Sequence, residues 1–141
     1  MSLLKIPFIE RHSNTLYPFN FDFRFTNKIA EAIGFGFNST QPDRSTVFHK
    51  GKFQIESRHK FRQLTKKLKY SDEFSELKDV FTAKGANGNG VQVCKGDSGG
   101  GLNVNEIQVG VTSLVDADCD KGFSAFVKVE NHLKWINKVI E

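Results

Sequence analysis

The stretch VCKGDSGGGL, residues 93–102, places four glycines around one aspartate and one serine. Attack by a serine hydroxyl needs a tight turn whose backbone N–H groups converge on the oxygen of a tetrahedral intermediate, and bulky side chains there would block the substrate. The glycines around Ser98 meet this need, and Asp97 could hold the turn by pairing with a buried cation or amide. On local evidence alone, the stretch is equally typical of a mobile glycine–serine turn.

The glycine-rich segments fit neither of two common nucleotide-binding motifs. A phosphate-binding P-loop needs GxxxxGK followed by serine or threonine, an order found in neither GANGNGV nor CKGDSGG. GFGFNS, residues 34–39, has two glycines of a dinucleotide fingerprint but not the third, and no βαβ pattern surrounds it. The serine turn therefore needs another explanation.

The rest of the chain predicts an all-β domain with two helices. Its 141 residues suit one domain, and its 14 phenylalanines favour strands. Helical spacing of apolar residues predicts helices at 57–70 and 129–141, and KGANGNG, residues 84–90, predicts an exposed loop. Apolar runs bounded by turn residues predict strands at 2–6, 32–37, 52–57, 91–94, 107–115 and 123–129.

Charge and cysteine content narrow the functional classes. A net charge of +4 predicts weak attraction to polyanions and does not indicate a nucleic-acid-binding protein. No apolar stretch approaches the ~20 residues of a membrane helix, and the first residues lack the layout of a signal peptide. By spacing alone, Cys94 and Cys119 could form a disulfide, remain thiols or belong to a metal site.

GDSGG, preceded by a cysteine and followed by leucine, closely resembles the nucleophile motif of the chymotrypsin-like serine proteases. GVTSL, residues 110–114, is similar to the substrate-binding strand of that family, and FVKVENHLKWINKVI is similar to its last strand and C-terminal helix. IGFG near residue 34 resembles the opening of the second barrel, and SLLKI resembles the strand just after the catalytic aspartate. The resemblance covers almost the whole chain, but only the C-terminal half of the family's domain and a sliver of its first barrel.

The resemblance implies an all-β fold, namely the second β-barrel of a chymotrypsin-like double barrel with a short intermediate helix and a C-terminal helix. Residues 1–25 are then the end of the first barrel and the interdomain linker, and residues 26–141 are the C-terminal barrel. In this family the catalytic histidine and aspartate belong to the first barrel. The chain is therefore expected to be a truncated portion that is inactive alone.

The implied activity is that of an extracellular serine endopeptidase that forms an acyl-enzyme with a protein or peptide substrate and needs no cofactor or metal. Gly101, where the family usually has proline, resembles some arthropod modular proteases. The alternative is a non-catalytic protease homologue that binds partners through its loops or its basic helix. The intact GDSGG favours the enzyme.

Site roles follow from the same resemblance. Ser98 is the expected nucleophile, and the N–H groups of Gly96 and Ser98 are the expected oxyanion hole. Asp97 matches the acid that pairs with a newly freed N-terminal amine during zymogen activation. Cys94 and Cys119 match a conserved disulfide pair of the family, whereas Phe61 and Thr82 occupy the positions of another pair that is missing here.

The same register assigns a substrate pocket to Gln92, Ser113, Leu114, Val115 and Ser124. Gln92 stands where a trypsin has aspartate, so no buried negative charge is expected to pair with lysine or arginine. Val115 stands where an open pocket has glycine, and its branched side chain narrows the entrance. The pocket is therefore predicted to prefer substrates with a small apolar residue at P1.

The histidines and the basic helix carry weaker expectations. His12, His49, His59 and His132 are expected on the surface or at an interface. The basic segment 57–70 suits an amphipathic helix with a solvated basic face, and the alternative is contact with polyanions such as heparin-like chains or with acidic membranes.

Overall fold

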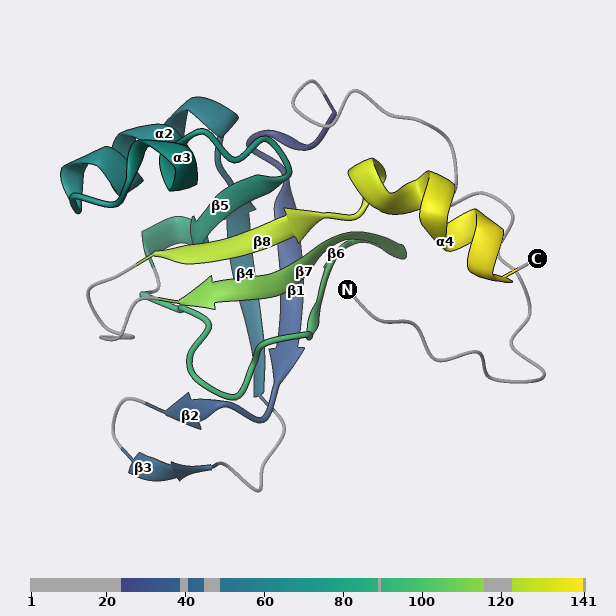
Figure 1. Ribbon diagram of the computed structural model, residues 1–141. Helices are drawn as coiled ribbons and strands as arrows, with labels where there is room; N and C mark the ends of the chain where they lie inside the picture. Colours follow the sequence, from purple (N-terminus) through teal and green to yellow (C-terminus); the bar gives the residue numbers. More distant parts are fainter. Residues whose placement is uncertain (1–23, 39–40, 45–48, 89, 116–122, 141) are drawn as a thin grey trace.

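The computed structural model describes residues 24–38, 41–44, 49–88, 90–115 and 123–140. Six antiparallel strands close into one barrel in the order β1-β4-β5-β8-β7-β6 (Figure 1). The strands are β1 Ile29–Gly34, β4 His49–Ile55, β5 Val80–Gly85, β6 Gly101–Val104, β7 Ile107–Val115 and β8 Ser124–Lys128. The predicted all-β barrel is confirmed.

Alternating burial turns one face of each strand toward the barrel interior. In β1, Ala30 and Ala32 are buried between more exposed neighbours, as the two-residue period of a strand requires. The interior is filled mainly by phenylalanine: Phe126 stacks on Phe81 with ring centroids 5.6 Å apart. Gly110 makes room for this pair, because a Cβ at that position would lie 2.9 Å from the Phe81 ring.

The helices lie outside the barrel, at the places that the sequence predicts. Helix α2 spans Arg58–Lys67, and the short α3 spans Asp72–Ser75. The predicted segment 57–70 is helical only as far as the C-cap Leu68, because Lys69 adopts φ 62°. At the C-terminal end a 3₁₀ turn, η3 Glu130–His132, leads into α4 Leu133–Ile140, which lies at the opposite side of the barrel from α2 (Figure 1).

A second apolar cluster fixes α2 to the barrel. Phe61 is 1% exposed and contacts the rings of Phe74 and Phe123, with centroids 5.8 and 6.4 Å away. Val80 and Ala125 complete the cluster from the neighbouring strands β5 and β8. The helix is therefore held by aromatic packing, and the satellite cluster is distinct from the barrel core.

Three sequence predictions on secondary structure need correction. Segment 91–94 is not a strand, because Val93 donates its N–H to a side chain, Ser124 Oγ at 3.1 Å, instead of to a neighbouring strand. The predicted loop 84–90 begins inside β5, and a 3₁₀ turn with Asn87 at φ 55° follows it. The predicted strand 32–37 is divided, since β1 ends at Gly34 and a separate two-stranded sheet, β2 Phe37–Asn38 with β3 Gln41–Arg44, follows.

Strands β5 and β6 and helix α3 were not predicted. The strand predicted at 107–115 matches β7 at both ends, and those at 52–57 and 123–129 overlap β4 and β8. The strand predicted at 2–6 lies outside the described residues. Within the described ranges, no helix is long and apolar enough to cross a membrane.

Candidate active site

The turn that carries Ser98 connects segment 91–94 to β6. Gly96 and Gly99 have φ of 97° and 87°, values that residues with a Cβ rarely adopt. Asp97 N–H donates to Cys94 O at 3.0 Å, and Gly100 N–H donates to Asp97 O at 3.0 Å. Ser98 lies exposed at the top of this turn. Gly96 and Gly99 thus allow two consecutive tight turns, which leave the Ser98 hydroxyl exposed.

The Asp97 carboxylate holds the turn from beneath. Its Oδ1 accepts the backbone N–H of Gly36 at 2.8 Å, and its Oδ2 accepts that of Cys94 at 2.9 Å. Hydrogen bonds to an ionised acceptor are about twice as strong as those between neutral groups. The half-buried carboxylate therefore ties the Ser98 turn both to its own beginning and to the segment after β1.

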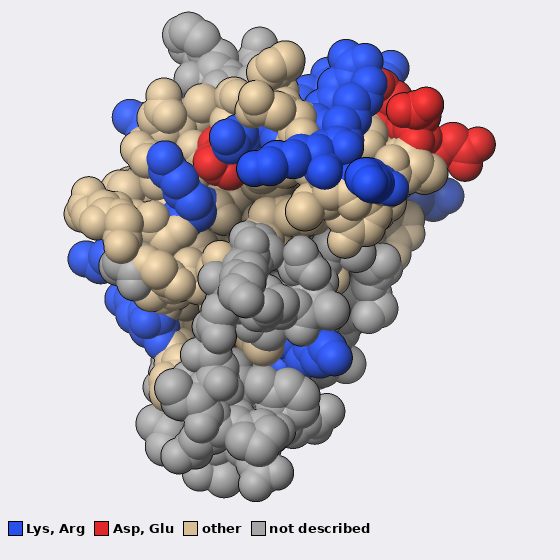
Figure 2. Space-filling model, turned by 90° about the vertical axis from the view of Figure 1, so that its left-hand side faces the viewer, with Lys and Arg blue, Asp and Glu red and all other residues tan. Residues whose placement is uncertain are grey.

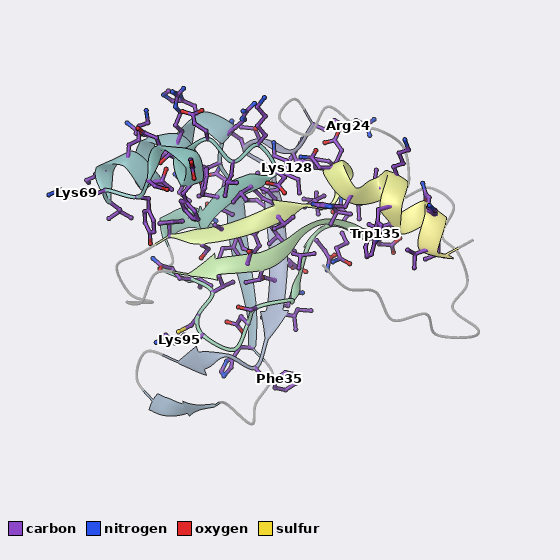
Figure 3. All side chains as sticks on the ribbon, viewed as in Figure 1. Arg24, Phe35, Lys69, Lys95, Lys128 and Trp135 are labelled. Atoms are coloured by element: carbon purple, nitrogen blue, oxygen red, sulfur yellow. The ribbon has the colours of Figure 1, made fainter. Side chains whose placement is uncertain are left out.

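Two glycines after the first strand make this approach sterically feasible. A Cβ at Gly34 would overlap Asp97 Oδ1, and a Cβ at Gly36 would lie 2.5 Å from the same carboxylate. A Cβ at Gly96 would in turn lie 3.1 Å from Gly36 Cα. The backbone of residues 34–36 thus packs directly on the Ser98 turn. Figure 3 shows Phe35 and Lys95 from these two segments at the same end of the barrel.

A third contact fastens the turn to β7. Gly99 N–H donates to Thr112 O at 2.9 Å, and Thr112 N–H donates to Gly100 O at 2.8 Å. Thr112 itself is buried, so these two hydrogen bonds join the turn to a buried position of the barrel. Sequence reasoning missed Gly34, Gly36 and Thr112 as supports of the site. The paired glycines of IGFG were the available signal for the first two.

Two backbone donors of the turn remain without an acceptor. The N–H groups of Gly96 and Ser98 donate to no atom of the described chain, whereas those of Asp97, Gly99 and Gly100 are hydrogen-bonded. Both residues are exposed. The turn can therefore offer two N–H groups to an external oxygen beside one serine hydroxyl, an arrangement suited to acyl transfer.

No described histidine serves Ser98 as a base. His49 begins β4, His59 lies exposed on α2, and His132 Nε2 lies 3.6 Å from Asp79 Oδ2. None of them hydrogen-bonds to Ser98, and His12 lies outside the described residues. Among the residues with described positions, no cluster of three histidine, cysteine or acidic side chains could hold a metal ion.

The structure brings most of the predicted pocket segments together. Val115 pairs with Ser124 across β7 and β8, and the hydrogen bond from Val93 to Ser124 Oγ joins segment 91–94 to them. The two strands shift register between Thr112 and Leu114, which leaves Ser113 as the extra, exposed residue. Gln92 is half-buried beside Val93. The side chains of Leu114 and Val115 lie outside the described part.

Ser124 is more enclosed than a residue on an open pocket wall. It is 2% exposed, and its hydroxyl already accepts the Val93 N–H. The Ser124 hydroxyl therefore satisfies a backbone amide that burial would otherwise leave unpaired.

The resemblance places a second disulfide of the family at positions 61 and 82, and both residues have other packing roles here. Phe61 is buried in the α2 cluster, and the buried Thr82 donates its hydroxyl to Glu56 Oε2 at 2.9 Å. Cys94 is buried at 6% exposure, and the described residues include no free cysteine. Cys119 lies outside the described ranges, so the pairing of these two residues is taken up below as a proposal.

Comparison with known proteins places this geometry in context. A family model described as Trypsin matches residues 26–136. Over 67 residues the chain is 34% identical to kallikrein-15 of Homo sapiens and of Saguinus oedipus, which corresponds to 46% of this chain and 26% of each relative.

Solved structures with the same barrel agree with the family match. Neuropsin, a serine protease expressed in the limbic system of mouse brain, superposes with a TM-score of 0.69 at 24% identity, covering 82% of this chain and 49% of neuropsin. The scabies mite inactivated protease paralogue S-D1 gives 0.68 at 21% identity, covering 81% and 47%. The chain thus spans about half the length of these structures, and these similarities show the fold alone.

Proposed function

Because the chain belongs to the trypsin family of serine proteases, we propose that it is the C-terminal barrel of a serine endopeptidase with Ser98 as nucleophile. The observation that carries the proposal is the turn at residues 96–98. It displays an exposed hydroxyl beside two N–H groups that have no acceptor in the described chain. In the proposed reaction, Ser98 Oγ attacks the scissile carbonyl, and the Gly96 and Ser98 N–H groups bind the resulting oxyanion.

The base that takes the Ser98 proton is proposed to come from a first barrel outside this chain, in the manner of the family. Five large apolar side chains on β1, just after it and on α4 support a covering domain, because they are exposed by 38–53%: Ile29, Ile33, Phe35, Trp135 and Val139. Residues 1–25 would connect the two barrels, and residues 26–141 would form the second.

We propose that the Asp97 carboxylate pairs with an N-terminal amine that activation cleavage sets free. An ionised carboxylate offers about four lone-pair sites. The two hydrogen bonds from Gly36 and Cys94 use one site on each oxygen. The remaining capacity of the half-buried carboxylate suits an ammonium group, which would strengthen the anchoring of the Ser98 turn.

A second candidate function is a non-catalytic homologue that binds partners. It is favoured by one observation: no described histidine hydrogen-bonds to Ser98. An inactivated protease paralogue also shares the fold. The two candidate functions can be distinguished by supplying a catalytic histidine, because only the enzyme would then become active.

The test joins the histidine- and aspartate-bearing first barrel of an activated trypsin-family protease to residues 26–141. We expect this two-barrel chimera to cleave peptides after small aliphatic P1 residues faster than after lysine or arginine. The family resemblance supports this preference, because Gln92 stands where a trypsin has aspartate and Val115 stands where an open pocket has glycine. A panel of peptides that differ only at P1 measures the ratio of kcat/KM values.

The matched control is Ser98→Ala in the same chimera, which should remove turnover of every peptide. A folded chimera without Ser98-dependent turnover would contradict the proposed function and favour the non-catalytic homologue. Faster cleavage after arginine than after alanine or valine would leave the function intact and refute the proposed role of Gln92.

Cys94 and Cys119 are proposed to form a disulfide, which would tie the Ser98 turn to the loop after β7 and fit an extracellular protein. Support comes from the buried position of Cys94 and the lack of a free cysteine among the described residues. Closing a loop of about 25 residues is worth roughly 3.5 kcal/mol in the chain-entropy model. Peptide mapping of oxidatively refolded protein without reductant should find the Cys94–Cys119 crosslinked peptide, and two free thiols would refute the pairing.

A further inference from the structure

Helix α2 presents a continuous basic surface on the outside of the molecule. Between Ser57 and Ser71 the chain has no acidic residue, and it has six lysines and arginines, namely Arg58, Lys60, Arg62, Lys66, Lys67 and Lys69. Figure 2 shows Lys and Arg side chains across the upper part of this face, with acidic side chains at its right-hand edge and beside the blue atoms near the centre. We call these six residues the α2 basic surface.

The helical period places three residues of the α2 basic surface in one row along the helix. Arg58, Arg62 and Lys66 follow each other at four-residue intervals, so their side chains lie about 6 Å apart along one side of the helix. Phe61 and Thr65 face the barrel and are buried. Lys69 extends the basic surface beyond the helix end, where Figure 3 shows it pointing away from the body of the protein. The result is a line of cations rather than a single charged spot.

Most of this charge is not neutralised within the described protein. Arg62 pairs with Glu76 at 2.7 Å, but Arg58, Lys66, Lys67 and Lys69 form no ion pair with a described acidic side chain. Lys66 and Lys67 complement the negative end of the helix dipole, whereas Arg58 and Lys60 lie at its positive end, where cations destabilise a helix. Fold stability therefore does not explain the charges of the first turn.

We propose that the α2 basic surface binds a linear sulfated polysaccharide. A ridge of cations at regular intervals fits a polymer with anionic groups repeated along its length, and counterion release supplies the affinity. A single-stranded nucleic acid would need exposed rings for base stacking. Phe61 is buried, and Tyr70, which is 41% exposed and stacks one face on Phe74 at 4.9 Å, gives this segment a single accessible ring instead of a row of them. The polysaccharide is therefore the better match.

The test compares two charge-matched triple variants of the full chain on immobilised heparin. The first is Arg58→Gln, Lys66→Gln and Lys67→Gln. The control is Lys84→Gln, Lys134→Gln and Lys138→Gln, three exposed lysines elsewhere on the molecule. We expect the first variant to lose roughly tenfold or more in affinity at low salt, with a shallower salt dependence, and the control to lose less than about threefold.

A footprint on the unmodified chain makes the result independent of how the variants fold. Heparin should protect Lys60, Lys66, Lys67 and Lys69 from acetylation and leave Lys134 and Lys138 reactive. Equal losses in the two triple variants, or equal protection of all these lysines, would show general charge attraction and refute the site. Tighter binding of single-stranded DNA of equal charge than of heparin would also overturn the proposal.

Discussion

Residues 1–141, purified as a folded monomer, should hydrolyse peptides on the order of 10⁶-fold more slowly than the two-barrel chimera. A neutral serine hydroxyl is a poor nucleophile unless a base removes its proton during attack. No described histidine hydrogen-bonds to Ser98, so the turn alone contributes only the N–H groups of Gly96 and Ser98. The measurement is turnover of the best peptide from the P1 panel at equal enzyme concentrations.

The expected size of this loss follows from how the parts of such a site cooperate. Removing the members of a catalytic triad leaves only what oxyanion binding and substrate binding provide. In the proposed two-barrel enzyme, the first barrel would also supply half of the substrate cleft. Ser98→Ala in residues 1–141 is the control, and it should change the already low rate by less than about tenfold.

Replacing Phe61 with alanine should lower the free energy of unfolding by about 3–5 kcal/mol. The side chain is 1% exposed and lies between Phe74 and Phe123, at a position where the family resemblance implies a cysteine. Its ring belongs to the apolar cluster in which α2 packs on Val80 of β5 and Ala125 of β8. Urea unfolding of residues 1–141, followed by circular dichroism, measures the change.

Leu68→Ala at the end of the same helix is the matched control. Leu68 is 44% exposed, so its loss should cost less than about 1 kcal/mol. If Phe61→Ala were no more destabilising than Leu68→Ala, the aromatic cluster would not be what fixes α2 to the barrel. If Phe61→Ala changed the dependence of the unfolding free energy on urea concentration, and not only the midpoint of the transition, unfolding would no longer be two-state.

The sequence predicted the barrel and its helices because its apolar residues recur with the periods of the elements they form. β7 was predicted at both ends, since nine residues between turn signals leave little freedom. β5 was missed because four consecutive residues from Val80 are buried, so the segment has no alternation of apolar and polar residues, and the polar Thr82 interrupts its apolar run. Segment 91–94 was predicted as a strand from its valines, but its amide is satisfied by Ser124, a tertiary contact that local sequence does not encode.

The Ser98 turn shows the same limit. The motif predicted which residues form the turn, but not what supports it. Asp97 bonds to Gly36, 61 residues away in sequence, and the backbone contact becomes possible only because Gly34 and Gly36 lack a Cβ. Such contacts depend on the closure of the barrel, which brings β1, β6 and β7 side by side.

Covalent labelling with a fluorophosphonate probe tests the central claim most directly. The claim is the proposal that Ser98 is a nucleophile whose base comes from outside this chain. Under identical conditions, the probe should label Ser98 in the two-barrel chimera and leave residues 1–141 unlabelled, with Ser98→Ala as the control in both. Strong Ser98-dependent labelling of monodisperse residues 1–141 would contradict the account, because a base within this chain would then activate the serine.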